Sequence, residues 1–109
     1  MKIELPPLIA AYFEADKNGD AGRVAECFAV DAVVKDGGHT YNGRNAIADW
    51  KAVSDKKFTY SCTPIKIDHH DDKDIVTGHL VGDFPGSPVD LRFIFKLEGD
   101  KITDLEIIP

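Results

Sequence analysis

Apolar residues occupy every second position from residue 89 to residue 97, and this pattern constrains the fold more than any other feature of the chain. A period of two places the side chains of Val89, Leu91, Phe93, Phe95 and Leu97 on one face of a β-strand. A strand with one apolar face has to bury that face against another layer of secondary structure. The pattern therefore predicts a sheet that is covered on one side.

Three more strands are predicted from turn residues and apolar patterns, over residues 58–67, 75–81 and 102–108. In the earliest of them Phe58, Tyr60 and Cys62 alternate, and the alternation changes parity across Pro64. A proline together with a change of parity is typical of a β-bulge or of a strand at the edge of a sheet. Polar or Gly/Pro-rich turns separate these strands, so we expect them to be connected as hairpins.

The first half of the chain carries the signals of three helices. The first is expected between Pro7 and Asn18, the second over residues 21–28 with Asp20 as its N-cap, and the third over residues 44–53. One face of each helix is apolar, as in helices that pack on a sheet.

A brief strand, Ala32 to Lys35, separates the second and third helices and ends at Asp36-Gly37-Gly38. The predicted order is therefore α-α-β-α-β-β-β-β, which is typical of an α+β fold with helices on one face of a sheet. With 109 residues, we expect a single domain over residues 1–109. A curved sheet folded over helices tends to leave a hollow between the layers, where small ligands bind.

Composition argues against several classes of function. The net charge is -6 and no cluster of Lys and Arg exceeds a pair, so a nucleic-acid partner is not expected. No apolar run approaches the length of about 20 residues that a membrane span requires, and the start of the chain lacks the apolar stretch of a signal peptide. We expect reduced thiols at Cys27 and Cys62 and a cytoplasmic location.

A polar hairpin loop at residues 69–74 has the composition of a metal site. It contains two histidines and three aspartates, in the sequence HHDDKD. Adjacent side chains diverge in a hairpin, and no second cluster in the sequence supplies further ligands. We interpret the segment as a solvated turn and expect neither a metal nor a cofactor.

Several stretches of the chain resemble the nuclear transport factor two-like superfamily, in particular its SnoaL-like and ketosteroid-isomerase-like branch. They are AYFEADKNGDAGRVAECF, FAVDAVVKD, YNGRNAIADW and the closing GDKITDLEI. The resemblance covers essentially the whole chain. It implies a cone-shaped fold in which three N-terminal helices pack in the concave face of a curved, mostly antiparallel sheet. It also implies a homodimer, because relatives of this fold usually pair through the outer face of the sheet, where Asp90 and Arg92 are expected.

The resemblance to the steroid isomerases implies two catalytic residues. In those enzymes a tyrosine on the first helix donates a hydrogen bond to the substrate oxygen, and an aspartate that ends the first strand moves the proton. Aligning the chain on the segments that flank the second helix places Tyr12 and Asp36 at these positions without a gap. The second acid of the isomerase oxyanion hole falls between Asp90 and Phe93, and the apolar alternation favours an inward Phe93. Half of that oxyanion hole is then missing.

The residues themselves leave other interpretations open. Asp36 before two glycines is also ordinary turn chemistry, in which the carboxylate accepts hydrogen bonds from loop N–H groups. Tyr12 shares an apolar stripe with Leu8 and Ile9, as a core tyrosine would. His39, three residues after Asp36, would either pair with that acid or lie in solvent.

Two hypotheses of function follow. In the first, the protein is an isomerase or lyase in which Asp36 moves a proton on a carbon next to a carbonyl and Tyr12 polarises the carbonyl oxygen. In the second, the same hollow serves a non-catalytic module for small-molecule binding or dimerisation. In both, the ligand is a small hydrophobic or carbonyl-containing molecule, and the residues expected to contact it are Trp50, Tyr60, Phe93, Phe95 and His39.

Overall fold

A computed structural model describes residues 3–57 and 59–109, and all of their side chains except those of residues 54–57. Phe58, the first residue of the strand predicted over residues 58–67, lies outside the described residues. In chain order the elements are α1 (Pro7–Lys17), α2 (Ala21–Glu26), β1 (Phe28–Asp36), β2 (His39–Asn42), α3 (Arg44–Lys57), β3 (Tyr60–His70), β4 (Lys73–Gly82), β5 (Val89–Glu98) and β6 (Lys101–Ile108).

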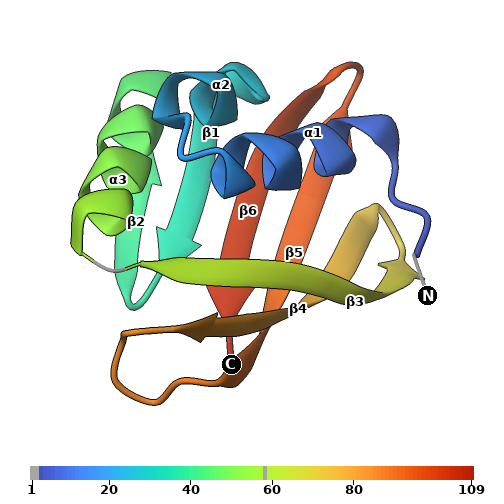
Figure 1. Cartoon of the computed structure of the whole chain (residues 1–109). Coiled ribbons are helices and arrows are strands. Elements are labelled where there is room, and N and C mark those ends of the chain that lie inside the picture. The colour runs from blue at the N-terminus through green and yellow to red at the C-terminus, as the bar shows by residue number, and fades with distance from the viewer. Residues whose placement is uncertain (1–2, 58) are drawn as a thin grey trace.

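The strands form one mixed sheet in the order β2-β1-β6-β5-β4-β3. Strands β1 and β6 run parallel, and every other neighbouring pair is antiparallel. The sheet curves strongly, and the three helices lie together on its concave side (Figure 1). The predicted α+β class and the cone-shaped arrangement are both confirmed.

The core lies between α1 and the inner face of the sheet. Phe93 and Phe95 of β5 point inward, as their alternation predicts, and meet two aromatic residues of α1. The Tyr12 ring packs edge-to-face on Phe95, with 5.4 Å between ring centroids, and the Phe13 ring packs in the same way on Phe93 at 5.2 Å. Edge-to-face pairs of this kind stabilise a core beyond the area that they bury. They fix α1 across the middle of the sheet.

Strand β2 was not predicted from the sequence. Residues His39–Asn42 pair antiparallel with the end of β1, with His39 opposite Asp36. The strand has only four residues, and its one apolar side chain, that of Tyr41, gives no alternation to detect. Strand β2 is held by its antiparallel pairing with β1 and not by an alternation of apolar residues in its own sequence.

The bounds of two neighbouring elements also differ from the prediction. Helix α2 ends at Glu26, and β1 begins at Phe28, four residues before the predicted Ala32. The register between β1 and β6 shifts between Phe28 and Val33. This irregularity breaks the alternation over the first half of β1, which is why the sequence pattern indicated only its second half.

Local signals elsewhere are confirmed. The Asp20 side chain accepts a hydrogen bond from the backbone N–H of Arg23, at 3.1 Å, and caps α2. The register between β3 and β4 shifts just after Pro64, and β3 is an edge strand, so both alternatives drawn from that proline are correct. Among the described residues, no helix is long and apolar enough to cross a membrane.

Candidate active site

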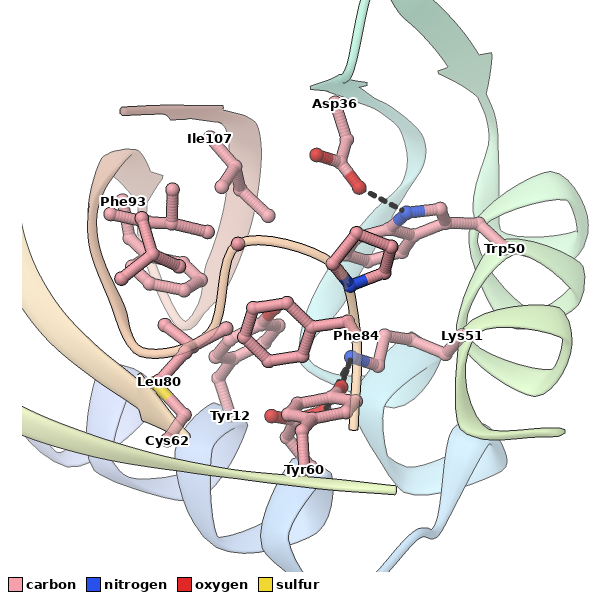
Figure 2. Close-up of a pocket in the computed structure, with 15 residues that line it drawn as sticks. Tyr12, Asp36, Trp50, Lys51, Tyr60, Cys62, Leu80, Phe84, Phe93 and Ile107 are labelled. Atoms are coloured by element: carbon pink, nitrogen blue, oxygen red, sulfur yellow. Dashed lines mark hydrogen bonds and ion pairs between the residues drawn. The ribbon is translucent and has the colours of Figure 1, made fainter. Parts of the chain in front are cut away.

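A cavity of about 500 Å³ opens between the helices and the concave face of the sheet. Most of its wall is apolar, and it receives side chains from α1, α3 and five strands, β1, β3, β4, β5 and β6 (Figure 2). The lining residues are Tyr12, Asp16, Asp36, Trp50, Lys51, Tyr60, Cys62, Leu80, Phe84, Pro85, Gly86, Val89, Leu91, Phe93 and Ile107. The volume falls within the range of pockets for small organic ligands.

Asp36 contributes a carboxylate to this cavity from the last position of β1. Its Oδ2 atom accepts a hydrogen bond from the indole N–H of Trp50, at 3.0 Å (Figure 2). Trp50 lies on α3 and is only 6% exposed, so the packed ring fixes the orientation of the carboxylate. The described chain offers no hydrogen bond to the other oxygen, Oδ1, which leaves an acceptor for a ligand.

Tyr12 reaches the same cavity from α1. The residue is only 1% exposed, and burial raises the pKa of its phenol well above the usual value. Its hydroxyl has no hydrogen-bond partner among the described residues. No fully buried side-chain nitrogen or oxygen of these residues lacks a partner, so the hydroxyl is accessible from the cavity. Tyr12 therefore presents a protonated hydroxyl to the cavity.

Asp16, Lys51 and Tyr60 form a buried polar triangle in the cavity wall. The Lys51 ammonium forms an ion pair with Asp16 Oδ1 and donates a hydrogen bond to the Tyr60 hydroxyl at 2.8 Å. The Tyr60 hydroxyl in turn donates to Asp16 Oδ1 at 3.0 Å. The side chains of Lys51 and Asp16 are only 5% and 8% exposed. Such a pair is stable in an apolar wall only because its polar atoms are matched.

The surroundings of Lys51 keep it positively charged. Burial disfavours the ammonium form, but interactions with Tyr12, Asp16 and Tyr60 favour it more strongly, so the pKa of Lys51 lies above its usual value. The ammonium also lies 4.9 Å from the centroid of the Trp50 ring, a distance at which cation–π attraction operates. Burial raises the pKa of Tyr60 to about 12, so this hydroxyl stays protonated at neutral pH.

The structure brings some of the predicted ligand contacts to the cavity and leaves two outside its wall. Trp50, Tyr60 and Phe93 line the cavity. Phe95 is fully buried in the core beside Tyr12 and does not line the cavity. His39 is exposed on β2, where its ring is near Tyr41, and it does not line the cavity either.

The sequence interpretation missed Asp16 and Lys51, although a signal for both was present. Asp16 follows Tyr12 by four residues on α1, so an inward Tyr12 places Asp16 on the same helix face. Lys51 follows Ile47 by four residues on α3, and Ile47 is fully buried. An acid and a base that both fall on buried helix faces predict a buried ion pair.

The cysteines and the histidine- and aspartate-rich hairpin do not add a disulfide or a metal site to the described part of the chain. Cys27 and Cys62 are free thiols, and burial raises the pKa of Cys62, in the cavity wall, to about 12. At the hairpin between β3 and β4, His69 pairs with Asp74 across the strands. No group of three or more His, Cys, Asp or Glu side chains gathers as metal ligands within the described part of the chain.

A curved mixed sheet that closes over three helices and holds a cavity between them defines the nuclear transport factor two-like class of folds. Within that class, a SnoaL-like domain matches residues 9–105, most of the chain. The chain therefore belongs to the SnoaL-like family. A search of curated proteins found no match.

Solved structures agree with this family. A candidate polyketide cyclase from Sinorhizobium meliloti is 38% identical, with a TM-score of 0.90 over 94% of both chains. A protein with a ketosteroid isomerase-like fold from Catenulispora acidiphila, in complex with trimethylamine, is 22% identical, with a TM-score of 0.85 over 97% of this chain and 87% of that one. TerC, co-crystallised with polyporic acid, is 18% identical, with a TM-score of 0.75 over 93% of this chain and 87% of TerC. The last two likenesses show the fold alone.

Proposed function

We propose that this protein is an enzyme of the isomerase, lyase or cyclase type that moves a proton on a carbon next to a carbonyl. Asp36 is the base and Tyr12 donates a hydrogen bond to the carbonyl oxygen. The observation that carries the proposal is the Asp36 carboxylate, oriented by Trp50 with one oxygen free, in a cavity that also receives the Tyr12 hydroxyl.

The chemistry follows from these two groups. Asp36 accepts the proton as the C–H bond breaks, and the electron pair of that bond moves toward the carbonyl oxygen to give an enolate. Tyr12 stays protonated because burial raises its pKa, so it donates to the oxygen on which charge develops. Asp36 then returns the proton to carbon, or the enolate carbon attacks a second carbonyl in the same molecule and the proton on Asp36 goes to the alkoxide that this attack forms.

The resemblance to the Sinorhizobium protein supports the second of these outcomes. That protein is a candidate polyketide cyclase, and it shares 38% of its aligned residues with this chain. A polyketide carries several carbonyl groups on a largely apolar skeleton, which suits a cavity with a mostly apolar wall and a few polar groups. We therefore place the substrate among oxygenated, largely apolar carbonyl compounds.

A non-catalytic binding module remains the second candidate function. It is favoured by Phe93, an apolar residue that lines the cavity at one end of the segment 90–93, where the resemblance to the steroid isomerases places their second acid. A binder with the same cavity would retain its ligand and exchange no protons.

Deuterium exchange into 2-tetralone separates the two functions. This bicyclic ketone is small enough for the cavity, and NMR in D₂O follows the loss of its signals next to the carbonyl. The wild-type protein is expected to accelerate the exchange, and Asp36→Asn is expected to lose a factor of about 10² or more, the usual contribution of a general base. Binding of 2-tetralone without accelerated exchange would establish the binding module instead.

The matched control is Asp31→Asn. Asp31 lies on the same strand and is exposed, so the variant removes the same charge outside the cavity. It is expected to retain the wild-type exchange rate. Equal losses in both variants would show a general effect of charge and would refute a specific role for Asp36.

We also propose that two copies of the chain pair through the outer face of the sheet. On this face His79 of β4 and Asp90 of β5 lie opposite each other and form a 2.7 Å hydrogen bond. Arg92 is exposed beside them, and Val81 of β4 is 47% exposed. A face with both charged and apolar side chains offers the mixed contacts of a standard interface.

A further inference from the structure

Two hydrogen-bond donors border the cavity without an acceptor in the described chain. One is the hydroxyl of Tyr12, a residue that is only 1% exposed. The other is Lys51, whose ammonium has three N–H donors, of which Asp16 and Tyr60 engage two. No fully buried side-chain nitrogen or oxygen of the described residues lacks a hydrogen-bond partner, so these two donors are accessible from the cavity. The cavity wall therefore offers two donors to an acceptor atom of a ligand.

These two donors lie at the same part of the cavity wall. Tyr12 and Asp16 are one turn apart on α1, a spacing that places their side chains side by side. Because Lys51 contacts Asp16 directly, its ammonium borders the helix face that carries Tyr12. Figure 2 shows Tyr12, Lys51 and Tyr60 on one side of the cavity and Asp36 with Trp50 on the other.

We infer that Lys51 is a further catalytic residue, which donates with Tyr12 to the oxygen of a carbonyl substrate and stabilises its enolate. Lys51 thus supplies the second donor of the oxyanion hole. The steroid isomerases use an acid for this purpose, whereas the inward side chain of Phe93 has no polar group. Asp16 and Tyr60 are positioning residues that hold the ammonium in place. This inference rests on the proposed function, and it narrows the substrate to compounds whose carbonyl oxygen becomes strongly anionic.

The charges balance through the step. The C–H bond breaks, its proton goes to Asp36, and its electron pair moves into the carbonyl system, so that the oxygen gains the negative charge that Asp36 loses. Lys51 stays protonated throughout, since its surroundings hold its pKa above the usual value. Asp16 cancels part of the ammonium charge in the ground state, and the substrate oxygen competes for that charge only as the enolate forms. Interactions that strengthen in the transition state in this way accelerate the chemical step.

4-Nitrophenol provides a test that does not depend on turnover. Its phenolate oxygen resembles an enolate oxygen, and its phenolate absorbs visible light while the phenol does not. We expect the wild-type protein to bind the phenolate about tenfold or more tightly than the phenol, which lowers the pKa of the bound probe by about one unit or more. Absorbance titration against pH, with the protein in excess, measures this preference.

Variants assign the preference to the two donors. Tyr12→Phe removes one donor, and the double variant Asp16→Asn/Lys51→Met removes the other without leaving an unpaired charge in the wall. Each is expected to reduce the preference for the phenolate to about threefold or less. Lys66→Met, which removes a lysine from β3 whose side chain is 65% exposed, is expected to retain it.

The outcomes distinguish this inference from the proposed function. If the wild-type protein does not bind the phenolate in preference to the phenol, or if the double variant retains the wild-type preference, the inference is overturned, whatever the result of the deuterium exchange. If Asp36→Asn exchanges protons as fast as the wild-type protein while the preference still depends on Lys51, the proposed function fails and the role of Lys51 in binding an anionic oxygen stands.

Discussion

Asp16 and Lys51 place a full charge pair in a wall that is otherwise mostly apolar, and this arrangement carries a cost in stability. Burial removes both groups from water, and their mutual attraction, together with the Tyr60 hydroxyl, offsets the lost hydration. A hydrophobic pair of similar size would serve the fold as well or better. The pair is therefore more readily explained by the chemistry of the cavity than by the stability of the core.

Lys51→Met is expected to destabilise the protein by about 3–5 kcal/mol, because it leaves the Asp16 carboxylate buried without its partner. The double variant Asp16→Asn/Lys51→Met is expected to recover most of this loss, since neither charge then remains. Urea denaturation of the wild-type protein and both variants measures the differences. A double variant as unstable as Lys51→Met would show that the ion pair itself stabilises the fold.

At the scale of single residues, the sequence led to Tyr12 and Asp36 only through their match to a known family. Charged residues on helices usually face solvent, so no role in the site was predicted for Asp16 or Lys51. Their helical spacing from Tyr12 and Ile47 was the physical signal that could have identified them. For His39, the sequence left pairing with Asp36 and exposure to solvent open, and the structure shows an exposed side chain.

At the scale of elements, prediction succeeded where one pattern was long and regular. β5 alternates over its whole length, and the structure gives it the inward face that this alternation predicts. β1 fails the same test, because an irregular register with β6 interrupts its alternation. β2 is too short to carry a pattern, and pairing with β1 defines it.

The outer face of the sheet carries the prediction of a dimer. Light scattering after size-exclusion chromatography is expected to give twice the mass of the chain. Arg92→Glu, which reverses a charge in the middle of this face, is expected to weaken the dimer about tenfold or more through repulsion between like charges. Lys17→Glu, at the exposed end of α1, reverses a charge away from the sheet and is the matched control. A monomeric wild-type protein, or equal effects of the two variants, would contradict the interface.

At the scale of the whole molecule, the curved sheet and the helices enclose a cavity with a base on one side and hydrogen-bond donors on the other. The order of helices and strands predicted the layers and the hollow between them. The polar groups of the hollow come from α1, α3, β1 and β3, which are distant in sequence. Their convergence is a property of the tertiary structure, which local patterns do not report.

A crystal structure of the complex with 2-naphthol tests the central claim most directly, because this phenol mimics the enol of 2-tetralone. The account predicts that its oxygen lies within about 2.6–3.2 Å of the Tyr12 hydroxyl and the Lys51 ammonium. The carbon next to the oxygen-bearing carbon should then face the Asp36 carboxylate. A naphthol bound the other way round, with its oxygen on Asp36 and its apolar rings against Tyr12 and Lys51, would contradict the assignment of base and oxyanion donors.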